Sequence, residues 1–374
     1  MSWPVRNFSE AISSSGIFTD GDWVESKDQD PRGDVRLIQL ADIGVGKFID
    51  KSDRFMSSAK AKELRCTFLE AGDILIARMP DPIGRACIFP ENMGKCVTVV
   101  DVCVIRPDSD DIDTKWLMHQ INSEKFKNQI NQHVTGTTRQ RISRGNLAKL
   151  EISVPPLAEQ KRIATILDKA DAIRRKRQQA IQLADDFLRA TFLDMFGDPA
   201  TNPKGWELKS LGELFKLSSG KGLSAKDMSA GAYPVYGGNG INGMHSEYLF
   251  EEPQLVIGRV GAYCGVIHIT KEKSWITDNA LYVREYLQDV NIHYLAQLLE
   301  ISNLNQYAGK AAQPLVSGSR IYPLKMIFPP LELQDQFQKV KEKFIASKSN
   351  ISVSRDNSEK FFFSLSQKAF SGQL

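Results

Sequence analysis

The sequence predicts an internally duplicated α+β protein, with two mixed α/β modules and two long helices. Two observations carry this prediction. The element Val154–Leu157 (VPPL) recurs 174 residues later as Phe328–Leu331 (FPPL). Each copy follows a stretch of short β-branched runs and precedes a long stretch with a helical pattern. We therefore expect the order module, long helix, module, long helix.

In the first module, short β-branched runs separated by glycines predict strands. These runs are Val35–Leu40, Ile74–Ala77 and Val97–Ile105. A helical pattern follows at Thr114–Gln129, and Trp116 is its first large apolar residue. Strands and helices of this kind in one module predict the α+β class.

The second module repeats the same elements in the same order. Its matches to the first module are Leu255–Arg259 with Ile74–Arg78, Thr277–Asn279 with Val100–Val102, and Asn291–Asn303 with Thr114–Gln129. Matches at several places along both copies are typical of a gene duplication and not of one shared motif.

The stretch from Ala158 to Met195 contains neither proline nor glycine and predicts one helix, about 55 Å long at the usual rise per residue. Small or apolar residues recur at alternating steps of three and four, which indicates a heptad seam. They are Ile163, Ile166, Ala170, Ile173, Ala180, Ala184 and Phe187. Arg177 is the one break in the seam. The long helical stretch of the second copy has a seam of its own, at the positions equivalent to those of the first.

Turn-forming residues set the boundaries. The first helix is expected to end at Phe196–Pro199, where Gly197 and Pro199 are stop signals. The following stretch, up to Gly205, predicts a linker. Trp206 begins the second module as Trp3 begins the first. The expected domains are residues 1–157, the first module; 158–197, a long helix; 198–330, the second module; and 331–374, a long helix.

The composition is that of an ordinary globular protein, with 42% hydrophobic and 25% charged residues and a net charge of +3. None of the five cysteines lies in a CxxC pair, which favours a reducing compartment and argues against a zinc site. Met1–Ile12 lacks the apolar core of a signal peptide, and the most apolar stretch, Val97–Ile105, is interrupted by Asp101. We expect a cytoplasmic protein without a membrane span or a metal site.

The motifs of two enzyme classes are incomplete. Methyltransferases need a glycine-rich turn that opens a helix, whereas Tyr236–Gly240 is followed by more glycine. Methyltransferases that act on an exocyclic amine also need an Asn or Asp directly before a proline pair. Val154 and Phe328 stand at that position here. A metal-dependent nuclease needs a lysine two residues after its second acid, but Met93 stands there after Glu91. We therefore expect a non-catalytic chain with no cofactor of its own.

Two basic segments at equivalent places favour nucleic acid as a partner. Residues 136–149 and 309–325 contain no acidic residue. Arg and Gln side chains suit guanine and adenine edges, and hydroxyl groups and lysines suit phosphates. The alternative for either segment alone is a solvated basic loop. The predicted DNA-binding residues are Thr137, Thr138, Arg139, Gln140, Arg141 and Arg144 in the first segment, and Lys310, Gln313 and Arg320 in the second.

Further candidates lie outside these segments. The glycine-rich stretch 233–248 predicts either a DNA-reading loop or a plain cluster of β-turns. Its candidate residues, with one lysine upstream, are Asn239, Asn242, His245 and Lys221. Arg78 and Arg259 each follow an equivalent strand, where each either contacts DNA or pairs with an acid inside its module.

Several of these motifs resemble one family. Thr135–Thr138 (TGTT), the spaced Ile142 and Leu147, and Ile152–Gln160 (ISVPPLAEQ) are similar to the conserved region of type I restriction–modification specificity subunits. Gly72–Leu75 and Tyr233–Gly240 are similar to other parts of the same proteins, so the resemblance covers essentially the whole chain. The second copy departs from the pattern. It keeps PPL but shifts the acid, and it has Lys310-Ala311 in place of the threonine pair.

The resemblance implies two target-recognition domains, each of which reads one half of a split, asymmetric site in double-stranded DNA. It also implies that the two long helices lie antiparallel as a coiled coil and hold the modules apart, with half-sites about one helical turn apart. The implied partners are two methyltransferase subunits, which carry S-adenosylmethionine, and restriction/translocase subunits. An architectural scaffold that binds protein, and a degenerate methyltransferase or nuclease, are the alternatives.

Overall fold

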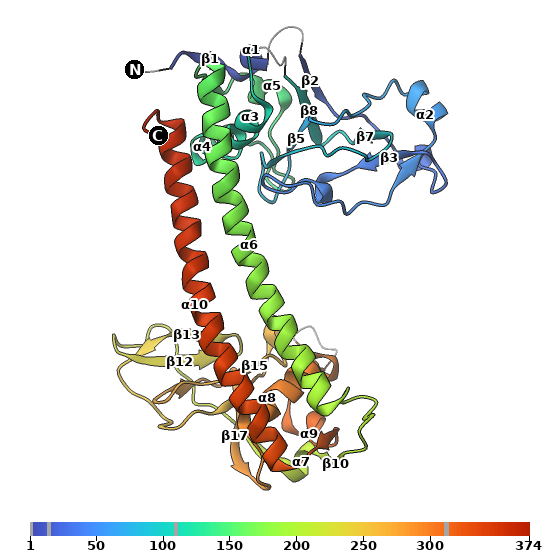
Figure 1. The fold of residues 1–374 in the computed structure, drawn as a ribbon. Coiled ribbons are helices and arrows are strands. Elements are labelled where there is room, and N and C mark those ends of the chain that lie inside the picture. Colours follow the sequence, from blue (N-terminus) through green and yellow to red (C-terminus); the bar gives the residue numbers. More distant parts are fainter. Residues whose placement is uncertain (1–2, 13–15, 108–110, 310–313) are drawn as a thin grey trace. The chain divides into compact units, whose positions relative to one another are not determined.

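The computed structural model describes residues 3–12, 16–107, 111–309 and 314–374. The chain divides into two compact units: unit 1 comprises Met1–Arg177 with Ser354–Leu374, and unit 2 comprises Gln178–Val353. Each unit contains one module and parts of both long helices, α6 (Leu157–Phe196) and α10 (Leu331–Phe370) (Figure 1). The predicted candidates Lys310 and Gln313 lie outside the described residues.

The strands of unit 1 form three small sheets. A pair joins β1 (Val5–Asn7) to β9 (Glu151–Ser153). The largest sheet is antiparallel, in the order β2 (Ile17–Asp20), β8 (Val102–Arg106), β5 (Ile74–Ala77), β6 (Ala86–Ile88). In the third sheet, β3 (Val35–Ile38) pairs antiparallel with β4 (Phe55–Met56) and parallel with β7 (Cys96–Thr98).

Two elements of unit 1 are divided where the sequence predicted one. The run 97–105 is split between β7 and β8, because Val100 and Asp101 form a turn that leads from one sheet to another. The helix expected at Thr114–Gln129 is α3 (Thr114–Ile121) followed by α4 (Glu124–Gln132). Between them, the Asn122 side chain bonds both the N–H and the carbonyl of Ala86, and Ser123 caps α4. Tertiary contact with β6 thus interrupts the helix.

Unit 1 also contains three short helices. They are α1 (Phe8–Ile12), α2 (Ser58–Glu63) and α5 (Arg144–Ala148). Its main core gathers around α3 and the antiparallel sheet, where Phe8, Ile74, Trp116 and Phe126 are completely buried. These four side chains come from α1, β5, α3 and α4, so the core joins the start of the module to its middle and its later part.

Unit 2 has the same three sheets in the same order, which confirms the predicted duplication. The pair is β10 (Glu207–Ser210) with β18 (Lys325–Phe328). The antiparallel sheet runs β11 (Phe215–Ser219), β17 (Ala280–Tyr286), β14 (Leu255–Gly258), β15 (Ile267–Ile269). The third sheet is β13 (Gly240–His245), β12 (Tyr233–Gly237), β16 (Trp275–Ile276), again with one antiparallel and one parallel pair. Its α-helices are α7 (Leu211–Leu214), α8 (Ile292–Ile301) and α9 (Gly318–Ile321).

Strand pairing gives the exact correspondence of the two copies. Ala77 of β5 lies opposite Val102, and its counterpart Gly258 of β14 lies opposite Ala280. Val100 therefore corresponds to Asp278, and the alignment of Val100–Val102 with Thr277–Asn279 is wrong by one residue. The strand register shows the shift, because both segments are short and share only one identical residue.

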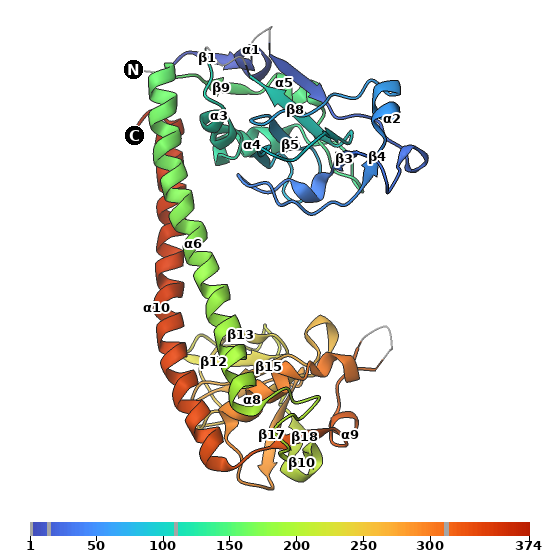
Figure 2. The ribbon, with the colours of Figure 1, turned by 45° about the vertical axis from the view of Figure 1, so that its right-hand side comes forward.

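The long helices run antiparallel within each unit (Figure 2). In unit 1, Arg174 of α6 bonds Glu359 of α10, and Arg162 donates to the carbonyl of Leu374 at 2.9 Å. Arg177, the break in the seam, donates to the carbonyl of Ser354 at 2.8 Å. In unit 2, Asp185 pairs with Lys348, and the rings of Phe187 and Phe344 stack with centroids 6.4 Å apart. In both units, positions later on α6 meet positions earlier on α10, as the resemblance implies.

One buried glutamine joins each long helix to its module. Gln160 accepts a hydrogen bond from the N–H of Asp113 at 2.8 Å and donates to the carbonyls of Asp111 and Pro155. Gln334 does the same in unit 2, accepting from the N–H of Asn291 at 2.9 Å and donating to the carbonyl of Pro329. Asp113 and Asn291 are the N-caps of α3 and α8. The shifted acid of the second copy therefore leaves this connection intact.

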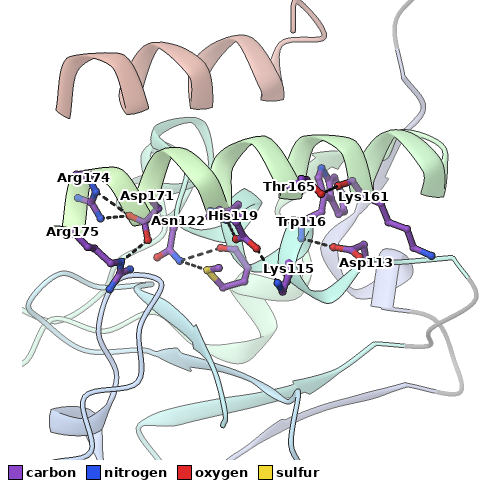
Figure 3. Close-up of polar contacts among 12 residues, drawn as sticks. Asp113, Lys115, Trp116, His119, Asn122, Lys161, Thr165, Asp171, Arg174 and Arg175 are labelled. Atoms are coloured by element: carbon purple, nitrogen blue, oxygen red, sulfur yellow. Dashed lines mark hydrogen bonds and ion pairs between the residues drawn. The ribbon is translucent and has the colours of Figure 1, made fainter. Parts of the chain in front are cut away.

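In unit 1, charged side chains extend the contact between α6 and the module. Asp168 accepts from Nε2 of the buried His119 at 2.8 Å and from Nζ of Lys115 at 2.9 Å. These two bonds, that of His119 first, hold the pKa of Asp168 below its ordinary value. One turn further, Asp171 binds Arg174 and Arg175 (Figure 3). Arg175 also donates to the carbonyl of Val45. The helix is thus held along about four turns.

We expect Gln160→Ala and Gln334→Ala each to lower the free energy of unfolding by about 1–3 kcal/mol, because each leaves a buried N–H without its acceptor. The measurement is urea unfolding followed by circular dichroism and by tryptophan fluorescence. Gln182→Ala removes an exposed glutamine of α6 and serves as the control, with a change below about 0.5 kcal/mol. Equal midpoints for all three variants would contradict the role of the buried pair.

The lowered pKa of Asp168 predicts a dependence of stability on pH. A carboxylate whose pKa is lowered by folding stabilises the protein above its ordinary value of 3.8, and this contribution is lost as the pH falls through the lowered value. We expect the difference in Tm between wild type and Asp168→Asn to be largest near pH 7 and to shrink towards pH 3. Asp186→Asn, at an exposed position of α6, is the control. A difference that stays constant from pH 7 to pH 3 would show that the charge of Asp168 is not what stabilises the contact.

Candidate nucleic-acid interface

The first basic segment forms a closed loop at the surface of unit 1. Thr135 and Arg141 exchange two backbone hydrogen bonds of 2.9 Å, which join the two ends of the loop. Gly136 has φ of 92°, and a Cβ there would lie 2.5 Å from the carbonyl oxygen of Arg139, so the turn requires glycine. The exposed side chains of the loop are Thr137, Thr138, Arg139, Gln140 and Arg141. None of these five side chains hydrogen-bonds to another residue within the described parts of the chain.

The loop is attached to the end of the central strand β5. The N–H of Ile142 donates to the carbonyl of Arg78 at 3.1 Å, and Ile142 is completely buried. Arg144, which begins α5, bonds the carbonyl of Phe18 and lies 3.5 Å from the carboxylate of Asp20. Arg144 is therefore held against β2, although its side chain is partly exposed.

Arg78 pairs with an acid inside its module, which is one of the two interpretations that the sequence left open. Its side chain is 2% exposed. Nη1 lies 3.4 Å from the carboxylate of Asp20, and Nη2 donates to the carbonyl of Val100. The guanidinium group is directed into the module, so Arg78 fixes the strand end to which the loop is attached and does not reach the surface.

The second basic segment occupies the equivalent place in unit 2. The N–H of Val316 donates to the carbonyl of Arg259 at 2.9 Å, as Ile142 does to Arg78. Gly309 and Leu315 join across the segment, as Thr135 and Arg141 do. Arg320 of α9 is exposed, and its guanidinium group packs against Gly309.

Arg259 has different partners from its counterpart Arg78. Its Nη1 donates to the hydroxyl of Ser219 at 3.1 Å and to the carbonyl of Asp278 at 3.3 Å. The strand register places Ser219 where unit 1 has Asp20. Arg259 is partly exposed, and no carboxylate of the described residues lies within 4.0 Å of it.

The glycine-rich stretch is a β-hairpin, made of β12 and β13 with Gly238 and Asn239 at its tip. Asn239 is exposed, and a Cβ on Gly238 would lie 3.7 Å from Cα of Gly258, so the tip packs against the end of β14. Asn242 is exposed too, and its amide covers Gly237 so closely that any Cβ there would overlap it. The stretch is therefore a hairpin, and its exposed polar residues Asn239 and Asn242 face solvent.

The other two candidates of this stretch differ in exposure. His245 is buried; its Nδ1 accepts from the N–H of Ser229 at 3.0 Å, and its ring meets the edge of Trp275. Lys221 is exposed, with Nζ 5.5 Å from the centre of the Trp275 ring. The structure thus directs His245 and Arg78 inward and leaves Lys221 at the surface.

The end of the central strand brings most of the candidates together in each unit. In unit 2, the basic segment, the hairpin tip and Ser219 all contact Gly258 or Arg259. Asp20 and Ser219 cannot be recognised from the sequence, because β2 and β11 have dissimilar sequences and carry no motif. Only the register of both sheets shows that these two residues correspond.

The described ranges lack both a candidate metal site and a candidate membrane span. No group of three or more His, Cys, Asp and Glu side chains there is arranged to hold a metal ion. No helix in those ranges is both long enough and apolar enough to cross a membrane.

Comparison with known proteins identifies the family. The model of the type I restriction modification DNA specificity domain matches residues 44–183 and again 203–358. The chain is 32% identical over 197 residues to the type I restriction enzyme EcoprrI specificity subunit of Escherichia coli, a stretch that covers 50% of this chain and 49% of that protein. It is 24% identical over 215 residues to the MjaIX specificity subunit of Methanocaldococcus jannaschii, which covers 52% and 48%. The matched region thus spans about half the length of these relatives.

A solved structure has the same fold over the full length. The type I restriction-modification S subunit from M. genitalium superposes with a TM-score of 0.62 at 18% identity, covering 99% of this chain and 96% of that one. The two family matches fall on the two copies of the repeat and together cover most of the sequence. The chain belongs to the family of type I restriction modification DNA specificity domains and carries two copies of that domain.

Proposed function

We propose that this chain is the DNA-specificity subunit of a type I restriction–modification complex, and that each module reads one half of a bipartite, asymmetric site. One observation carries the proposal beyond family membership. Both units present an acid-free segment at the same place, the end of the central strand, with exposed polar side chains. If each segment were only a solvated basic loop, nothing would require both modules to keep one without acids at the same place.

The exposed side chains have the chemistry of base and phosphate recognition. Arg139, Gln140 and Arg141 can form paired hydrogen bonds with guanine and adenine edges, and Thr137 and Thr138 suit phosphate oxygens. In unit 2, the exposed candidates are Arg320, Asn239, Asn242 and Lys221. The two sets differ in type and order, which favours different half-site sequences.

The chemistry of the complex belongs to partner subunits. Two methyltransferase subunits would carry S-adenosylmethionine and modify one adenine on each strand, and each adenine would be flipped out into a partner's active site. Restriction/translocase subunits would join the same complex. This chain would bind no cofactor, would act in the cytoplasm where the DNA is, and would set only the sequence at which its partners act.

Adenine methylation across the host genome, sequenced with and without this gene, tests the function. We expect deletion to abolish one bipartite, asymmetric methylated motif and to leave all others in place. The gene restored on a plasmid should restore the motif. An unchanged set of motifs, in a host whose partner methyltransferase is demonstrably active, would favour the architectural scaffold.

Arg141→Ala is expected to weaken binding by about 1–3 kcal/mol to DNA that carries the correct first half-site, and much less to DNA in which that half-site is scrambled. The measurement is a titration of the assembled complex against both duplexes. Lys62→Ala removes one exposed positive charge from α2 and is the matched control. Equal weakening on both duplexes would show that Arg141 contacts phosphate and reads no base.

A further inference from the structure

We propose that Arg259 binds a DNA phosphate in the second half-site, and that Asp20 removes this contact from the equivalent place of the first module. The inference rests on the proposed function, and it assigns different roles to two arginines that the duplication made equivalent. Arg259 would be a backbone anchor, whereas Arg78 would be a positioning residue for its loop.

The geometry of the two arginines is the same except for one partner. Each follows the central strand of its sheet, and its carbonyl accepts from the basic segment. Arg78 donates to the carbonyl of Val100, and Arg259 to that of the corresponding Asp278. The third partner lies on the edge strand beyond β8 or β17, and it is Asp20 of β2 for Arg78 and Ser219 of β11 for Arg259.

This one difference changes the charge at the strand end. In unit 1, the carboxylate of Asp20 lies within 3.5 Å of both Arg78 and Arg144, so it offsets part of their positive charge. In unit 2, the hydroxyl of Ser219 orients Arg259 without offsetting its charge. The carboxylate of Asp278 does not take over, because it lies against Gly222. Arg259 thus keeps a full positive charge.

The surroundings of Arg259 fit an anion from outside the chain. Its Nη1 is occupied by Ser219 and Asp278, and no other described residue accepts from Nη2 or Nε, so their donors can serve another acceptor. Nearby lie the hairpin tip at Gly238 and Val316 of the basic segment. An arginine held at one nitrogen and partly exposed has little reach into a groove, so the phosphate oxygen is the acceptor that fits.

The experiment measures how the affinity of the assembled complex for DNA depends on salt. Each phosphate contact steepens the slope of log K against log salt by about 0.9 for duplex DNA. We expect Arg259→Met to make the slope shallower by about 0.9, on the methylated motif and on a duplex with a scrambled second half-site alike. Lys62→Met, which removes an exposed positive charge from α2, should leave the slope unchanged.

A second pair of variants keeps Arg259 in place and guards against misfolding. Ser219→Asp places a carboxylate where the first module has that of Asp20. It should make the slope shallower, as Arg259→Met does. Ser219→Thr keeps a hydroxyl for Arg259 without adding charge and should leave the slope at the wild-type value. Each variant is checked by thermal unfolding and by its assembly with the methyltransferase subunits.

Two outcomes would overturn the inference. An unchanged slope in both Arg259→Met and Ser219→Asp would exclude a phosphate contact. A loss confined to the duplex with the intact second half-site would show that Arg259 reads a base. The wild-type complex separates these results from failure of the proposed function itself. If the wild type shows no sequence preference among duplexes, the specificity role fails; if it does and the variants match it, only this inference fails.

Discussion

The buried amide of Gln160, and its copy Gln334, is the interaction on which each unit depends. A glutamine side chain without exposure must find partners for both ends of its amide, and here it finds them on two different elements. One amide thereby holds both a proline carbonyl close to the start of the long helix and the N–H of the N-cap residue of α3 or α8. The strand pair β1–β9 or β10–β18 leads directly into this point, so helix, pair and module share one junction.

The two junctions are alike, but the packing beside them is not. In unit 2, Phe192 and Phe196 of α6 pack against Tyr294 and Phe337, and all four side chains are completely buried. The offset of 174 places Ser366 of α10 where unit 2 has Phe192. Unit 1 has a cavity of about 650 Å³ at this place, lined by Ser366, Phe363, Phe370 and residues of α4. In unit 2, aromatic packing thus fixes α6 to the module. In unit 1, the attachment of α10 relies more on polar contacts, such as that between Arg174 and Glu359.

The duplication, the α+β class and the two long helices could be predicted from the sequence, because repeated motifs and a heptad seam are local patterns. The break between α3 and α4 could not, since it depends on the contact of Asn122 with β6. Of the candidate site, the loop of Thr137–Arg141 is exposed, as expected from its polar and basic composition. The inward positions of Arg78 and His245 depend on Asp20 and Ser229, which are distant in sequence. No pattern in one sequence reports such pairs, because the sheet register that joins them is set by the whole module.

The partner of the strand-end arginine lies on an edge strand, apart from the loop whose side chains face solvent. A change from serine to aspartate there alters the charge behind the loop and leaves every residue of the loop as it was. With the roles proposed for these residues, affinity for the DNA backbone and choice of sequence would be set at separate positions. Single substitutions on the edge strand would then change the affinity for one half-site and leave the loop that reads its sequence unchanged.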